Sequence, residues 1–147
     1  MSIGRICCRE VDVIEPEESA AAAAVRMRDR CVGTLAVLDA NQLPVGIVTD
    51  RDLVTRVMAA GKDPARLKIA EIITRPAETV REDAPIEDVL LQMRGARIRR
   101  MLVVDDSGRL AGIVSVDDIV SLLSEEFGRV GHLLDSQASQ PPLSKTV

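Results

Sequence analysis

The sequence predicts a mixed α/β fold of the α+β type, built from two β-α-β-β-α repeats that pack with pseudo-two-fold symmetry. The first observation is an internal repeat, because a displacement of 66 positions aligns residues 6–60 with residues 72–126 without a gap. The second is that the strands expected at 35–38 and 101–104 are apolar on both faces. A repeat of roughly 60 residues cannot cover both faces alone, so the two copies are expected to pack together and leave equivalent clefts at their junction.

The elements of the first repeat follow from its local patterns. A short β segment at 11–14 precedes an Ala-rich helix at 19–30. Apolar strands are predicted at 35–38 and 45–48, and the polar residues between them, Asp39-Ala40-Asn41-Gln42, suit a hairpin turn. An amphipathic helix at 50–60 closes the repeat.

The second repeat reads in the same order. A strand at 78–80 is followed by a helix that opens at Ala84-Pro85, where proline suits the first helical turn, and runs through Met93. Strands at 101–104 and 110–114 flank the turn Asp105-Asp106-Ser107-Gly108, and a helix at 116–127 closes the repeat.

Breaker residues and composition set the predicted boundaries. Gly61 to Pro64 end the first repeat, and residues 66–73 form a short helical lead-in to the second. We therefore expect repeat 1 at 1–62 and repeat 2 at 63–134. The polar tail at 135–147 contains a proline pair and is expected to be disordered.

Composition disfavours several classes of partner. The formal net charge is −4 and Phe127 is the single aromatic residue, so neither a broad polyanion-binding surface nor base stacking is expected. No apolar run approaches the roughly 18–20 residues of a membrane span, and the N-terminus lacks a signal-peptide pattern. These features predict a cytoplasmic protein with no membrane partner.

The cysteines predict a reduced protein without a metal site. Cys7, Cys8 and Cys31 are odd in number and form no CxxC, and His132 is the only histidine. The adjacent Cys7 and Cys8 are either small packing residues or redox-sensitive thiols.

Two related turns point to a family. GIVTDRDL (46–53) and GIVSVDDI (112–119) each join Gly-Ile-Val to a hydroxyl residue and an aspartate three positions further on. Together with RRMLVVDDSGRLAGIVSVDDI (99–119) and EIIT (71–74), they resemble the CBS domain, over residues 3–130. The resemblance implies a stand-alone tandem pair, or Bateman module, that binds AMP, ADP, ATP or S-adenosylmethionine, forms a homodimer and regulates an unknown protein partner.

The chemistry of the turn is compatible with such a ligand. A hydroxyl residue at a strand-to-helix junction caps the helix, and the free N–H groups of the first turn attract anions. Asp52 and Asp118 offer acceptors for the two ribose hydroxyls, while the backbone near Ile47 and Ile113 can pair with the adenine edge. The alternative is a plain capping box that needs no ligand.

The resemblance assigns site residues by position, and each cleft combines both repeats. The first cleft would comprise Ile47, Thr49, Asp52, Ile73, Ile98 and Arg99. The second would comprise Ile113, Ser115, Asp118, Cys7, Val32 and Gly33.

Charge distinguishes the two expected clefts. Arg99 and Arg100 align with Gly33 and Thr34, so the first cleft should be basic and the second neutral, and a polyphosphate should prefer the first. The arginines at 94, 97, 99 and 100 are alternatively a solvated surface or a docking site for an acidic partner or nucleic acid.

The sequence also bears on three other functions. A scaffold module that only dimerises would use Thr49 and Ser115 as caps and bind no ligand. An enzyme is not expected, because the sequence shows no nucleophile–base pair and no Walker-type loop. Nucleic-acid binding would depend on the arginine cluster and would weaken steeply with salt.

Overall fold

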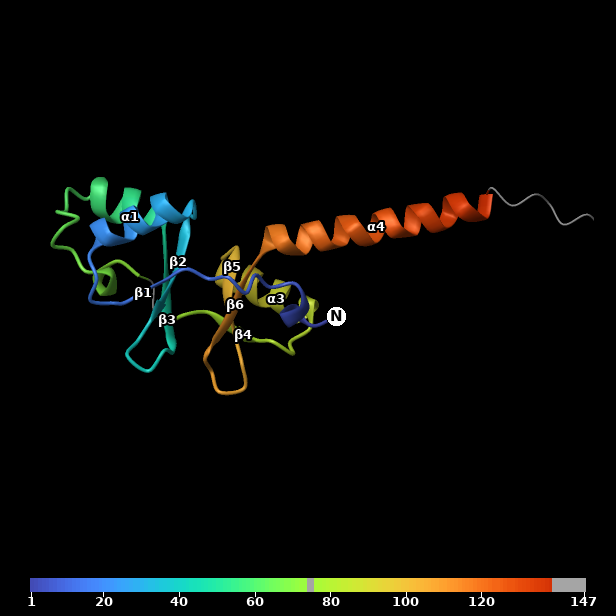
Figure 1. Cartoon of the computed structure of the whole chain (residues 1–147), viewed down its shortest axis with the longest axis horizontal. Helices are drawn as coiled ribbons and strands as arrows, with labels where there is room; N and C mark the ends of the chain where they lie inside the picture. Colours follow the sequence, from blue (N-terminus) through green and yellow to red (C-terminus); the bar gives the residue numbers. More distant parts are fainter. Residues whose placement is uncertain (74–75, 139–147) are drawn as a thin grey trace, which may run out of the picture.

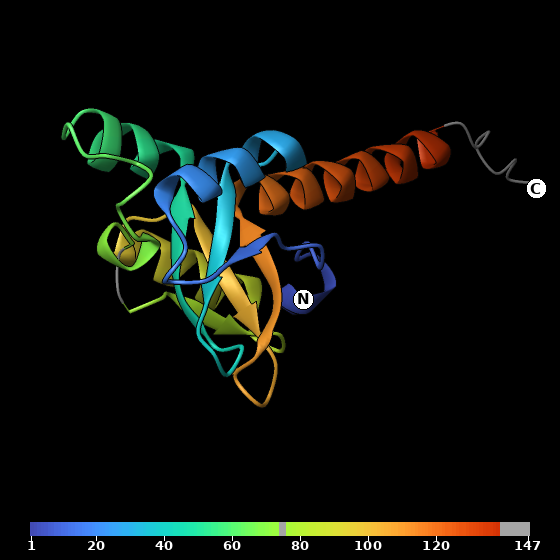
Figure 2. The ribbon, with the colours of Figure 1, turned by 60° about the vertical axis from the view of Figure 1, so that its left-hand side comes forward.

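The structure is a computed structural model that describes residues 1–73 and 76–138. It confirms the mixed α/β fold with two similar halves (Figures 1 and 2). The first half contains, in chain order, η1 (Ile3–Arg5), β1 (Val13–Ile14), α1 (Ala20–Arg30), β2 (Thr34–Leu38), β3 (Pro44–Thr49), α2 (Asp50–Asp52) and η2 (Leu53–Met58). The second contains η3 (Ile69–Glu71), β4 (Thr79–Arg81), α3 (Ile86–Ala96), β5 (Arg100–Val104), β6 (Leu110–Ser115) and α4 (Val116–Ala138).

Each half has its own three-stranded sheet with the same topology. The strand orders are β1-β2-β3 and β4-β5-β6, in which the first pair is parallel and the second is antiparallel. The registers also repeat, since Thr34 pairs with Thr49 and Arg100 pairs with Ser115. The repeat found in the sequence is therefore a structural repeat, down to a register shift near the end of β2 and of β5.

The two cores exchange their lead-in segments. Ile69, Ile72 and Ile73, which precede the second sheet, are buried in the core of the first half. Ile3 in turn is buried in the core of the second half, with Ile6 and Cys7 packed against it. Each lead-in thus stabilises the other repeat, so the halves are joined by burial as well as by the chain.

Both faces of the central strands are covered, as the sequence predicts. Leu35 and Val37 belong to the first core, whereas Ala36 between them is fully buried on the opposite face of β2. Leu102 is likewise fully buried outside the core that contains Met101 and Val103. These opposite faces are turned toward the other repeat.

The α3 helix begins one position later than expected. Pro85 is the N-cap, with an extended ψ of 149°, and the first helical residue is Ile86. Pro85 therefore stands just outside the helix instead of in its first turn. Both α1 and α3 end in a left-handed residue, Cys31 and Arg97, at equivalent positions of the repeats.

The closing helices of the two repeats differ in length. The first ends within π-helical η2, and Gly61 follows with a positive φ of 64°. The second, α4, runs for 23 residues and projects well beyond the rest of the molecule (Figures 1 and 2). The predicted end at Phe127 was wrong, because no proline interrupts residues 116–138.

The expectation of a disordered tail at 135–147 also needs correction, since residues 135–138 belong to α4. Residues 139–147 and Thr74 of the EIIT motif lie outside the described residues. Within 1–73 and 76–138, no helix combines the length and apolar character needed to cross a membrane.

Candidate functional site

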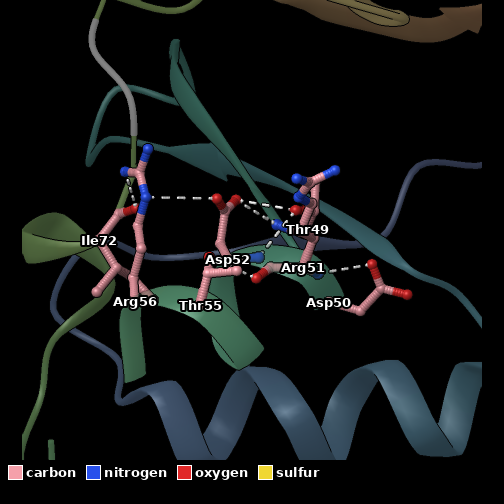
Figure 3. A network of polar contacts seen from close by, with 7 residues as sticks. All are labelled: Thr49, Asp50, Arg51, Asp52, Thr55, Arg56 and Ile72. Atoms are coloured by element: carbon pink, nitrogen blue, oxygen red, sulfur yellow. Dashed lines mark hydrogen bonds and ion pairs between the residues drawn. The ribbon is translucent and has the colours of Figure 1, made fainter. Parts of the chain in front are cut away.

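The turn between β3 and α2 is a reciprocal capping box. The Thr49 hydroxyl oxygen accepts a hydrogen bond from the Asp52 N–H at 3.2 Å, and the Thr49 N–H donates to Asp52 Oδ2 at 2.9 Å (Figure 3). The Thr49 hydroxyl also lies 3.0 Å from the same carboxylate oxygen. Thr49 and Asp52 therefore hold each other at the start of the helix.

The turn between β6 and α4 repeats this geometry. The Ser115 N–H and hydroxyl each lie 2.7 Å from Asp118 Oδ2, and the Asp118 N–H donates to the Ser115 hydroxyl oxygen at 3.2 Å. The capping interpretation is thus confirmed for both turns. In each turn a single carboxylate oxygen carries the cap, which leaves Oδ1 for another partner.

That remaining oxygen is in a different environment in the two repeats. Arg56 approaches Asp52 Oδ1 with its Nε at 3.6 Å, and its terminal nitrogen donates to the Ile72 carbonyl at 2.7 Å (Figure 3). At the equivalent position the second repeat has Leu122. Among the described residues, Asp118 has no ion pair.

The Thr49–Asp52 turn opens on a cavity of about 580 Å³ between the repeats. Residues of the first repeat form one wall, and residues that precede β4 or lie just before and at the start of β5 form the other. The lining residues are Ile47, Thr49, Asp50, Arg51, Asp52, Pro76, Ala77, Glu78, Arg97, Ile98, Arg99 and Arg100.

The Ser115–Asp118 turn opens on a smaller cavity of about 260 Å³. It too is lined by both repeats: Cys8, Glu10, Val11, Asp12, Val32, Gly33, Thr34, Arg100, Ile113, Ser115 and Asp118. Larger hollows of about 660 and 830 Å³, which are more open to the surface, contain neither capped turn, so volume alone does not locate the site.

Most of the residues predicted for the clefts meet in these two cavities. Ile47, Thr49, Asp52, Ile98 and Arg99 line the first, and Val32, Gly33, Ile113, Ser115 and Asp118 line the second. Ile73 and Cys7 line neither cavity. Ile73 is buried in the first core, and Cys7 packs against the second core, where burial raises the pKa of its thiol.

The second cavity has Cys8 where the sequence suggested Cys7. Cys8 and Ile113 exchange backbone hydrogen bonds of 2.8 and 2.9 Å, and Cys7 Sγ lies against Gly112. The side chains of neighbouring residues in an extended segment point to opposite sides, so only one cysteine can face the cavity. Positional alignment carries no information about this alternation.

The charges of the two cavities have opposite sign. Four arginines (51, 97, 99 and 100) and three carboxylates (Asp50, Asp52 and Glu78) line the first, which agrees with the basic cleft expected there. The second was expected to be neutral, but Glu10, Asp12 and Asp118 line it with Arg100 alone. Glu10 and Asp12 come from the N-terminal segment that crosses to the second repeat.

Besides Asp52, two of the lining charges are paired with residues outside their cavities. Arg99 lies 3.2 Å from Asp117, and both side chains are exposed. Asp12 lies 2.7 Å from Arg30. Among the described residues, no group of three or more His, Cys, Asp or Glu side chains could hold a metal ion.

Comparison with known proteins identifies the family. The family model described as CBS domain matches the chain twice, at residues 3–59 and 69–125. The chain belongs to the CBS domain family. Both matched segments contain a capped turn and its cavity wall, so the two clefts lie between two CBS repeats.

Relatives and solved structures agree with this assignment. The chain is 41% identical over 113 residues to Uncharacterized protein YlbB of Bacillus subtilis, which covers 76% of this chain and 74% of YlbB. It is 35% identical over 122 residues to Uncharacterized protein MK0525 of Methanopyrus kandleri, which covers 83% of this chain but only 62% of MK0525. The CBS domain pair of protein MJ0100, solved in complex with 5′-methylthioadenosine and S-adenosyl-L-methionine, is 28% identical with a TM-score of 0.75, and the alignment covers 86% of this chain and 98% of that one.

Proposed function

We propose that this CBS pair is a cytoplasmic regulatory module that binds an adenosine nucleotide, AMP, ADP, ATP or S-adenosylmethionine, between its repeats and modulates a protein partner. The observation that carries the proposal is the pair of capped turns, each of which opens on a cavity lined by both repeats. The MJ0100 pair, of similar fold, binds two adenosine compounds.

Each turn supplies the groups that such a ligand requires. One oxygen of Asp52 or Asp118 is held by the cap, and the other can accept hydrogen bonds from the ribose hydroxyls. Ile47 or Ile113 covers a face of the adenine ring. Arginines near the first turn offer donors to phosphate.

Regulation follows from the placement of the clefts between the repeats. A ligand shifts a conformational equilibrium only when its affinity differs between the two arrangements. Each repeat buries the lead-in of the other, so a ligand that draws the walls of a cleft together also acts on these shared cores. No catalytic step is part of this proposal.

We further propose that the module is a homodimer that uses α4. Its exposed apolar residues alternate at spacings of three and four, as in a coiled coil: Val120, Leu123, Phe127, Val130 and Leu134. Gly128 and Gly131 lie in the same projecting part of the helix, where such residues destabilise an isolated helix. A second copy presents the same stripe of apolar residues and can bury both.

Ligand-dependent stability tests the proposed function. A ligand that binds only the folded chain at about 100 times its Kd should add about 2.7 kcal/mol to the free energy of unfolding. We expect at least one of AMP, ADP, ATP and S-adenosylmethionine to raise the urea midpoint. If none does, while the chain remains a dimer, the scaffold alternative is the correct one.

A further inference from the structure

Arg100 lies between the two clefts. It is the one residue that lines both cavities within the described part of the chain. Arg100 is the first residue of β5, pairs in register with Ser115, and lies on the same side of the strand as the buried Leu102. Its guanidinium is therefore on the face of the sheet that is turned toward the first repeat.

The first cleft has the charges and volume for a phosphorylated ligand. Besides Arg100, it contains Arg51 and Arg97, and its volume is about 580 Å³. Arg56 faces Oδ1 of Asp52, the oxygen that the cap does not use, and this pairing weakens that oxygen as an acceptor for ribose. Binding in this cleft should therefore depend strongly on arginine–phosphate hydrogen bonds.

The second cleft has the opposite character. Its volume is about 260 Å³, and within the described residues Glu10 and Asp118 form no ion pair there and are opposed by Arg100 alone. These carboxylates would repel a phosphate, whereas they would not repel an uncharged or cationic group. Asp118 also has Leu122 one turn later instead of an arginine, so its free oxygen is the stronger acceptor for ribose hydroxyls.

We infer that the two clefts select ligands by charge: the Asp52 cleft binds a phosphorylated adenosine nucleotide, and the Asp118 cleft binds an uncharged or cationic adenosine derivative. Arg100 determines this selectivity, because one guanidinium cannot bind a phosphate in each cleft at the same time. The inference depends on the proposed function and specifies which ligand class each cleft takes. When a phosphate in the first cleft binds Arg100, the positive charge of Arg100 is neutralised and the net charge of the second cleft becomes more negative.

Calorimetry on the full chain tests this division with ATP, uncharged 5′-methylthioadenosine and S-adenosylmethionine, whose sulfonium is cationic. Asp52→Asn and Asp118→Asn each retain an oxygen for the cap while reducing the acceptor strength toward ribose. We expect Asp52→Asn to weaken ATP binding and leave 5′-methylthioadenosine unaffected, and Asp118→Asn to abolish 5′-methylthioadenosine binding and leave ATP unaffected. Saturation with 5′-methylthioadenosine should leave one site for ATP.

Arg100→Thr tests the shared residue, since threonine is the residue at the equivalent position, Thr34. We expect ATP to bind about tenfold more weakly, as for the loss of one charge-assisted hydrogen bond. Binding of 5′-methylthioadenosine should stay within about twofold, and S-adenosylmethionine should bind more tightly. Arg109→Thr is the matched control, because it removes the same charge from the β5–β6 turn, outside both linings, and should change none of the three.

The outcomes separate the two proposals. If one aspartate substitution weakens the binding of both ATP and 5′-methylthioadenosine, or if Arg100→Thr behaves like Arg109→Thr, the selection by charge is wrong while the proposed function stands. If none of the three compounds binds the unsubstituted chain, the proposed function fails, and this inference fails with it.

Discussion

Arg56 holds its Nε 3.6 Å from Oδ1 of Asp52. The same arginine donates to the Ile72 carbonyl at 2.7 Å, so it ties the proposed ribose acceptor to the lead-in of the other repeat. Leu122 replaces it in the second repeat. One substitution therefore makes the two sites chemically unequal, although their capped turns have the same geometry.

Exchange of Arg56 and Leu122 should exchange the strengths of the two aspartates as acceptors for ribose hydroxyls. In an Asp118→Asn background, Arg56→Leu should make the Asp52 cleft bind adenosine about threefold more tightly, because an unpaired carboxylate accepts hydrogen bonds better. The free energy of unfolding should fall by about 1 kcal/mol with the loss of a partly exposed ion pair and a hydrogen bond. Calorimetry and urea unfolding measure the two effects.

The reciprocal change is the control. In an Asp52→Asn background, Leu122→Arg should weaken adenosine binding at the Asp118 cleft by a similar factor. Weaker adenosine binding after Arg56→Leu would mean that Arg56 contacts the ligand directly and does not act only by pairing with Asp52.

The hydroxyl caps should contribute stability without any ligand. Thr49→Ala should lower the free energy of unfolding by about 1 kcal/mol, because the Asp52 N–H loses its acceptor at the helix start. Thr49→Ser, which installs the residue of the second repeat, should retain nearly all of it. Urea unfolding of the ligand-free protein measures this difference. Equal stability of the alanine and serine variants would show that the hydroxyl cap contributes nothing to the free energy of unfolding.

Two glycines should respond oppositely to alanine. At Gly112 an added Cβ would lie 2.8 Å from both Cys7 Sγ and the Cys8 carbonyl oxygen, so the N-terminal segment would have to shift. We expect a loss of about 1–3 kcal/mol. At Gly128 an added Cβ would meet nothing within 4 Å, and Gly128→Ala should stabilise α4 by up to about 1 kcal/mol. Thermal unfolding of both variants tests this, and a harmless Gly112→Ala would argue against the close crossing.

The apolar stripe of α4 should control assembly. Phe127 is 76% exposed at the middle of the stripe, so Phe127→Glu should place a charge in the dimer interface and yield monomers. Light scattering after gel filtration measures the mass. Ser121→Glu adds the same charge outside the stripe and should leave the dimer intact. A monomeric unsubstituted chain would exclude the proposed dimer.

The fold could be predicted well from the sequence because each local pattern occurs in both repeats. Each strand and turn appears twice at a displacement of 66, so a weak local signal such as Val13–Ile14 is supported by its equivalent at Thr79–Val80. The capping geometry of Thr49 and Ser115 also follows from local chemistry alone. Elements whose copies differ, such as α2 with η2 against α4, were predicted least accurately.

Features that depend on contacts between distant segments could not be read from local pattern. The acidic second cleft arises because Glu10 and Asp12 follow an N-terminal segment that pairs with β6, more than 100 positions away. The exchange of Cys7 for Cys8 in the cavity wall has the same origin. Arg100 aligns with Thr34 in sequence, but its position between both clefts emerges only from the packing of the two sheets.

The central claim is that the two clefts bind adenosine compounds through Asp52 and Asp118. Calorimetry with AMP, ADP, ATP and S-adenosylmethionine, on ligand-free chain and on the Asp52→Ala and Asp118→Ala variants, tests it most directly. We predict saturable binding of at least one compound, lost at a single cleft by substitution of that cleft's aspartate. Binding that persists unchanged in both variants, or no binding of any of the four, would contradict the account.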